Sequence, residues 1–117
     1  MTEGLNTIIV PVSDLAKAKA LYGELLGVQP SSDAPYYVGF DVDGQQLGLD
    51  PNGHASGMTG PVGYWHVDDI NGSVKALVEA GAVIQRDVVD VGGGRLIATV
   101  TDDDGNVIGL LSDAATG

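Results

Sequence analysis

The stretch LNTIIVPVSDLAKAKALYGELLG, residues 5–27, decides the fold because it predicts a strand that leads directly into a helix. The β-branched run over residues 5–12 predicts a buried strand. Ser13 and Asp14 stand where a helix N-cap belongs, and Gly27 ends the helical pattern. The apolar residues at helical spacing are Leu15, Ala18, Leu21, Tyr22, Leu25 and Leu26.

The same order of signals returns in the second half of the chain. VGYWHVDD (62–69) predicts a strand, and INGSVKALVEAGA (70–82) predicts a helix that ends at Gly81. Its apolar face is predicted to comprise Ile70, Val74, Leu77 and Val78. YYVGFDVDGQQLGL (36–49) and GRLIATVTDDDGNVIGLL (94–111) each predict a hairpin, turning at Asp-Gly pairs. Between the halves, PNGHASGMTGP (51–61) has loop composition.

The two halves align as an internal repeat. Pro11 to Leu15 matches His66 to Ile70, a shift of 55 (66 − 11), and the hairpins match with a shift of 61 (105 − 44). Each half therefore reads as a βαβββ module, and one such curled sheet cannot bury both faces alone. The expected fold is α+β, with two tandem modules of curled mixed sheet, about 1–55 and 60–117, in one domain of residues 1–117.

Composition excludes several partners. The net charge of −11, from 5 basic and 16 acidic residues, disfavours nucleic acid and anionic membrane, which both require Lys and Arg. The sequence has neither an apolar run of membrane-spanning length nor a basic-then-apolar leader. The chain has no Cys, which excludes disulfides and thiolate metal sites and fits a reducing compartment. We expect a cytoplasmic protein.

Three segments carry a family resemblance: LNTIIVPVSDLAKAKALYGELLGV, VDDINGSVKALVEAGA and TDDDGNVIGLL. They resemble the vicinal oxygen chelate superfamily, also called glyoxalase/bleomycin-resistance/dioxygenase proteins. The resemblance implies paired βαβββ modules, each an open cup, that usually enclose a pocket in a homodimer. The superfamily contains metal-dependent isomerases, lyases, epimerases, dioxygenases and thiol transferases, and also proteins that only bind and sequester drugs. Fold alone does not choose among them.

The resemblance also implies where metal ligands would stand. Enzymes of this superfamily place a ligand seven residues before the helix-opening aspartate, which here gives Thr7 (14 − 7) and Val62 (69 − 7). They place another four residues after the hairpin glycine, which here gives Gly48 (44 + 4) and Gly109 (105 + 4). Zinc, iron and manganese need several His or carboxylate ligands. We therefore expect no metal and no cofactor; a relocated site that uses His66 and Asp50 is the alternative.

Strand alternation predicts which side chains line the cup. Tyr64 and His66 share the face of Val62, whereas Trp65 and Val67 face the helices, so Trp65 is predicted to lie in the core. Tyr36 or Tyr37 is expected to add an aromatic wall. The predicted ligand-binding residues are Thr7, Ile9, Tyr37, Gln46, Gly48, Val62, Tyr64, His66, Arg95 and Gly109.

Several of these residues have two or more interpretations. Gly48 and Gly109 make room for a bulky ligand, or they relieve crowding between strands. His66 is a wall or dimer-interface residue, a hydrogen-bonding ligand contact, or a general base with Asp68 as an imperfectly placed orienting group. Arg95 contacts a ligand carboxylate or phenolate, or forms a surface salt bridge.

Three further features predict ordinary loops. Three consecutive glycines, residues 92–94, lack the context of a phosphate loop and predict a flexible hairpin over the pocket mouth. The aspartates at 102–104 predict turn chemistry. His54 lies in a glycine-rich loop and is expected to be solvated.

The leading functional hypothesis is a metal-free, homodimeric small-molecule-binding protein whose ligand is largely apolar or aromatic, such as an antibiotic or an aromatic metabolite. The alternative is a lyase, isomerase or dioxygenase-type enzyme that uses a relocated metal or acid/base catalysis by His66. A third possibility is a vestigial pocket on a protein that acts through its dimer surface.

Overall fold

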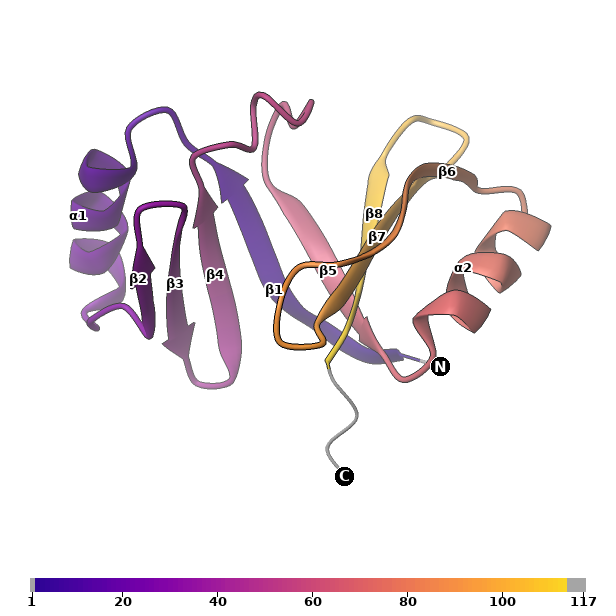
Figure 1. Cartoon of the computed structure of the whole chain (residues 1–117), viewed down its shortest axis with the longest axis horizontal. Helices are drawn as coiled ribbons and strands as arrows, with labels where there is room; N and C mark the ends of the chain where they lie inside the picture. Colours follow the sequence, from indigo (N-terminus) through magenta and orange to yellow (C-terminus); the bar gives the residue numbers. More distant parts are fainter. Residues whose placement is uncertain (1, 114–117) are drawn as a thin grey trace. The chain divides into compact units, whose positions relative to one another are not determined.

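The computed structural model describes residues 2–113 and has an α+β fold, as the sequence predicts (Figure 1). These residues form eight strands and two helices: β1 Thr2–Pro11, α1 Leu15–Leu26, β2 Ser32–Ala34, β3 Tyr37–Val42, β4 Gln45–Asp50, β5 Val62–Val67, α2 Ile70–Glu79, β6 Val83–Asp90, β7 Leu96–Thr101 and β8 Val107–Ser112. Within the described range, neither helix is long and apolar enough to cross a membrane.

The chain divides into two compact units. The N-unit is Asn6–Val62, and the C-unit comprises the described residues 2–5 and 63–113. The order strand, helix, three strands occurs twice along the chain. The division falls inside β1, whose first four residues belong to the C-unit.

In the N-unit the strands lie in the order β2-β3-β4-β1. β1 pairs with β4 in parallel, and the other pairs are antiparallel. Val38, Phe40 and Leu49 form the buried centre of this sheet, at most 1% exposed. One side of α1 covers them with Leu15, Ala18, Tyr22 and Leu26.

The ends of α1 lie where the sequence predicts them. The Asp14 side chain accepts a hydrogen bond from the Lys17 backbone N–H, and Gly27 adopts the left-handed conformation (φ 68°) that closes the helix. Two of the six apolar residues at helical spacing do not face the sheet. Leu21 and Leu25 are 68% and 75% exposed, because they project from the side of α1 that does not meet the sheet.

In the C-unit the strands lie in the order β5-β8-β7-β6, with β5 and β8 parallel and the other pairs antiparallel. The Asp69 side chain caps α2 by accepting a hydrogen bond from the Gly72 backbone N–H, as predicted. The helix ends at Glu79, ahead of the predicted Gly81, which has a positive φ of 115°. The core of the unit comprises Val67, Ile70, Val74, Ala98, Val100 and Leu110.

Strand register follows the sequence repeat. Ile9 is opposite Gly48 in the N-unit, and Tyr64 is opposite Gly109 in the C-unit. These pairs are related by the shifts found in the sequence, 55 for the first strand (64 − 9) and 61 for the hairpin (109 − 48). Gly48 and Gly109 therefore occupy equivalent places in their own sheets.

The prediction that Trp65 lies in the core was wrong. Its neighbour Val67 is buried against α2, but Trp65 is 39% exposed and does not join that cluster. Alternation fixes which face of β5 a side chain occupies, whereas burial also requires a covering element. The buried residues of α2 pack against Val67 and not against Trp65, which therefore stays at the surface.

Candidate functional site

The ten predicted site residues are divided between the two units. Six lie in the N-unit: Thr7, Ile9, Tyr37, Gln46, Gly48 and Val62. Four lie in the C-unit: Tyr64, His66, Arg95 and Gly109. Each group is described within its own unit, and a cup that combines both groups stays a prediction.

Thr7 and Gln46 meet across the parallel pair of β1 and β4. They are register partners, and the Thr7 hydroxyl donates a hydrogen bond to Oε1 of Gln46 over 3.3 Å. Thr7 is fully buried, so its hydroxyl needs such a partner. At the first of the four positions where the superfamily places metal ligands, the side chain is therefore hydrogen bonded to another residue of the same sheet.

The space directly above Gly48 is filled by the protein itself. A Cβ atom at this position would lie 2.7 Å from Cδ1 of Ile9 and 2.8 Å from Cε1 of Tyr37, closer than real contacts allow. The Tyr37 ring also lies over Gly39, the register partner of Gly48, where a Cβ would be 3.1 Å from Cε2. The two glycines accommodate the tyrosine ring.

Gly109 has the same relation to Tyr64. A Cβ at Gly109 would lie 2.7 Å from Cδ2 of Tyr64 and 2.8 Å from the backbone oxygen of Gly63. Tyr64 is only 6% exposed. In both units a tyrosine ring thus covers the glycine at the implied ligand position. Of the two interpretations of these glycines, relief of crowding between side chains is the one that these contacts favour.

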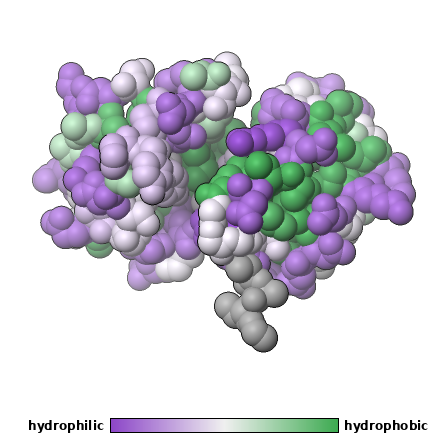
Figure 2. All heavy atoms as spheres, viewed as in Figure 1, coloured by the Kyte–Doolittle hydropathy of each residue, from purple (hydrophilic) through white to green (hydrophobic). Residues whose placement is uncertain are grey.

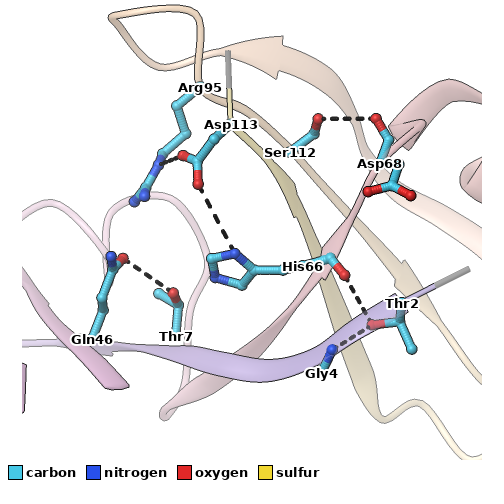
Figure 3. A network of polar contacts seen from close by, with 9 residues as sticks. All are labelled: Thr2, Gly4, Thr7, Gln46, His66, Asp68, Arg95, Ser112 and Asp113. Carbon is cyan, nitrogen blue, oxygen red and sulfur yellow. Dashed lines mark hydrogen bonds and ion pairs between the residues drawn. The ribbon is translucent and has the colours of Figure 1, made fainter. Parts of the chain in front are cut away.

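The C-unit brings His66 and Arg95 to one carboxylate, that of Asp113. Nε of Arg95 donates to Oδ1 of Asp113 over 2.8 Å, and Nδ1 of His66 lies 4.0 Å from Oδ2. Figure 3 shows the carboxylate between the two side chains. The His66 side chain is 14% exposed and that of Arg95 30%, whereas Asp113 is 56% exposed. We call His66, Arg95 and Asp113 the polar cluster.

Sequence reasoning missed Asp113. His66 and Leu111 are register partners in β5 and β8. Asp113 follows Leu111 by two residues, so both side chains lie on the same face of the sheet. The prediction of Asp68 as the orienting group is replaced by Asp113, because the Asp113 carboxylate lies beside the imidazole. The Asp68 backbone oxygen instead accepts the Ser112 hydroxyl at 3.5 Å.

Arg95 forms a salt bridge with Asp113. Contact of Arg95 with a ligand stays a prediction. The three glycines before it close the hairpin of β6 and β7, and all three have positive φ. The Gly92 N–H donates to the Asp90 carboxylate over 2.7 Å. Placement of this hairpin over a pocket mouth stays a prediction.

The aspartates at 102–104 form a turn, as predicted. Oδ1 of Asp102 accepts the backbone N–H groups of Asp104 and Asn106, and Oδ2 accepts the Asn106 side-chain amide over 3.0 Å. The amide and backbone N–H of Asn106 lower the pKa of the Asp102 carboxyl below its ordinary value of 3.8.

The four implied ligand positions do not fit a divalent metal. Val62, Gly48 and Gly109 offer no donor atom from a side chain, and Thr7 offers a hydrogen-bonded hydroxyl. Among residues 2–113, no three His, Cys, Asp or Glu side chains are grouped so that they could hold an ion.

Comparisons with known proteins identify the family and the fold. A sequence profile of the Glyoxalase/Bleomycin resistance protein/Dioxygenase superfamily matches residues 4–110. No curated protein sequence matches the chain.

Solved structures with a similar fold include a superfamily member from Vibrio splendidus 12B01 (18% identity, 92% of this chain and 96% of that one, TM-score 0.70). Methylmalonyl-CoA epimerase from Mycobacterium tuberculosis is 19% identical over 97% of this chain and 89% of that one, with a TM-score of 0.69. The Mn(II)-bound glyoxalase from Novosphingobium aromaticivorans is 20% identical, over 99% of this chain and 40% of that one, with a TM-score of 0.69. At these identities the likeness concerns the fold alone.

Proposed function

Because the chain belongs to the Glyoxalase/Bleomycin resistance protein/Dioxygenase superfamily, we propose that it binds a small, partly aromatic molecule without a divalent metal. An antibiotic or an aromatic metabolite is the ligand class that we expect. The protein acts as a homodimer in the cytoplasm under this proposal.

One observation carries the proposal: at both glycine positions a tyrosine ring occupies the space that a metal-binding side chain would need. A Glu at position 48 would meet Tyr37 and Ile9, and a Glu at position 109 would meet Tyr64 and the Gly63 backbone. Both positions hold glycine, and the neighbouring residues fill the space that a ligand side chain would need. Tyr64 is buried, but the Tyr37 ring is partly exposed, and aromatic surface suits an apolar or aromatic ligand.

The polar cluster supplies the hydrogen bonds that orient such a ligand. The His66 imidazole and the Arg95 guanidinium are both partly exposed, and both lie near the Asp113 carboxylate. Pockets that bind small molecules combine a mainly apolar lining with a few such polar groups. A ligand with a phenolate, carboxylate or sulfonate next to an aromatic ring matches this combination, since Arg95 favours planar anions.

Calorimetric titration with 8-anilinonaphthalene-1-sulfonate, an anionic aromatic probe, tests the proposal. We expect saturable binding that weakens about fivefold in His66→Ala, the effect of one lost hydrogen bond worth about 1 kcal/mol. His54→Ala, in the loop after β4, is the matched control and retains wild-type affinity. Equal affinity in all three proteins contradicts a ligand site at the polar cluster.

A second function, acid/base catalysis by His66, is supported by the carboxylate of Asp113 near its Nδ1. A general base needs a group that orients it, and Asp113 can do so once a bound ligand tightens the 4.0 Å separation. Incubation of a bound ligand in D₂O, followed by NMR, would reveal exchange at a carbon atom. Catalysis predicts exchange that Asp113→Asn slows while the ligand affinity is retained. A pure binding protein shows no exchange.

A further inference from the structure

Two exposed apolar surfaces lie one in each unit: a projecting edge on α1 and a groove beside α2. The first projects from the N-unit and consists of Leu21 and Leu25 on α1; we call it the α1 ridge. The side chains are 68% and 75% exposed, the highest values among the large aliphatic residues of the described chain. They stand one helical turn apart, separated by about 6 Å along the axis, so they form a continuous apolar edge.

The second surface is a groove in the C-unit between α2 and β6, which we call the α2–β6 groove. It has a volume of about 550 Å³. Val74, Val78, Ile84 and Val88 form its apolar lining, and Asn71, Lys75, Glu79 and Asp87 form its polar rim. Val78 and Ile84 are each 41% exposed. Figure 2 shows hydrophobic surface gathered over the part of the C-unit that Figure 1 labels β6.

The charges around the two surfaces are complementary. Lys17 lies one turn before Leu21 on the same side of α1, and Glu24 lies beside Leu25. The groove presents carboxylates at Glu79 and Asp87 and an amine at Lys75. The chain has only 5 basic residues and a net charge of −11, so two copies repel each other except where such a lysine meets an acidic rim.

We propose that the α1 ridge of one copy docks in the α2–β6 groove of a second copy. An amphipathic helix that lays its apolar edge in a groove is a recurring mode of recognition. The proposal rests on the self-association proposed above and is independent of ligand binding. It assigns the contact to side chains and not to the free edge of β6. That edge is interrupted by register shifts on both sides of Arg86, which disfavour strand-to-strand pairing.

A mixing experiment tests this contact, because the ridge and the groove are separate surfaces. Sedimentation velocity should show that Leu25→Asp (ridge) and Val78→Asp (groove) each weaken self-association of the full chain by roughly 10- to 100-fold. An equimolar mixture of the two variants should form a complex of one copy of each, since the ridge of one protein and the groove of the other remain intact. Val91→Asp, at a 50% exposed apolar residue outside both surfaces, is the matched control and associates like the wild type.

A second pair of variants in the same association experiment reverses the charge of one residue on each surface and leaves the apolar residues unchanged. Lys17→Glu and Asp87→Lys are each expected to weaken association, and their mixture is expected to recover it. Circular dichroism of every variant checks folding, and Leu21→Ser with Ile84→Ser replaces any variant that fails this check.

Two outcomes would overturn the proposal. If the wild-type chain stays monomeric at about 1 mM, where even weak complexes form, both the proposed homodimer and the proposed docking contact are wrong. A wild-type dimer that neither pair of variants disturbs leaves the homodimer standing and rejects the ridge and groove as its interface. Binding of the aromatic probe in the same samples reports separately on the proposed ligand site.

Discussion

The absence of a side chain at Gly48 makes room for the Tyr37 ring and the Ile9 side chain on the sheet. Gly48→Ala places a methyl group against Tyr37 and Ile9, so we expect a loss of about 1–3 kcal/mol in the free energy of unfolding, as for other overpacked sites. Gly60→Ala is the matched control, because nothing lies within 4 Å of a Cβ there. Urea denaturation of both variants measures the difference.

Tyr37→Ala identifies the cause of that loss. If the tyrosine ring is the obstacle, Gly48→Ala costs much less in the Tyr37→Ala background, and the two changes are strongly non-additive. Additive costs would mean that Ile9 or the backbone, and not Tyr37, requires the glycine.

Asp102 makes the turn before β8 sensitive to acid. Its pKa is lowered in the folded protein by Asn106, so the folded state binds the proton less readily than the unfolded chain does. The resulting stabilisation is present above pH 3.8, the ordinary pKa, and disappears as the pH falls through the lower, folded-state value. We expect Asp102→Ala to flatten the dependence of unfolding free energy on pH below about pH 4. Asp103→Ala, which removes none of these hydrogen bonds, should keep the wild-type dependence.

The sequence predicted the roles of residues that act within one helical turn. It did not predict side-chain positions that depend on pairing between strands distant in the sequence. Asp14, Asp69 and Gly27 act within one helical turn, so spacing alone predicts their roles. The direction of the Tyr37 ring depends on the register of β3 and β4, and the position of Asp113 depends on the pairing of β5 with β8. The sequence alone does not specify the register of either strand pair, so it does not predict these contacts.

At the scale of elements, the capping aspartates fix where each helix begins. Asp14→Ala and Asp69→Ala each remove the acceptor for an N–H in the first turn, so each should cost about 1 kcal/mol of unfolding free energy. Asp68→Ala is the control, since its neighbour Asp69 and not Asp68 caps α2. A loss at Asp68 equal to that at Asp69 would show that negative charge near the N-terminus of α2, and not the capping hydrogen bond, causes the effect.

The helices and strands could be predicted because each sequence pattern occurs twice along the chain. The helices, the two hairpins and the strand containing His66 all occur in the structure, and the register in each unit follows the sequence shifts. Periodicity could not tell which apolar residues meet the sheet. Leu21, Leu25 and Trp65 fit their patterns, yet they are exposed because no element of the described chain covers them.

At the scale of the whole molecule, family membership and the fold are established, whereas the chemistry depends on what has replaced the metal ligands. A Mn(II)-bound glyoxalase has a similar fold. In the present chain, three of the four implied ligand positions have no donor side chain, and tyrosine rings cover two of them. We therefore predict that function in this protein does not require a metal ion.

Metal content of the untagged protein tests that claim most directly. The protein should be expressed in medium supplemented with manganese, iron, cobalt, nickel and zinc, purified without chelator, and analysed by inductively coupled plasma mass spectrometry. We predict a metal content well below one ion per chain, and no change in melting temperature when EDTA or Mn²⁺ is added. About one tightly bound ion per chain, together with a melting temperature that falls in EDTA, would contradict it.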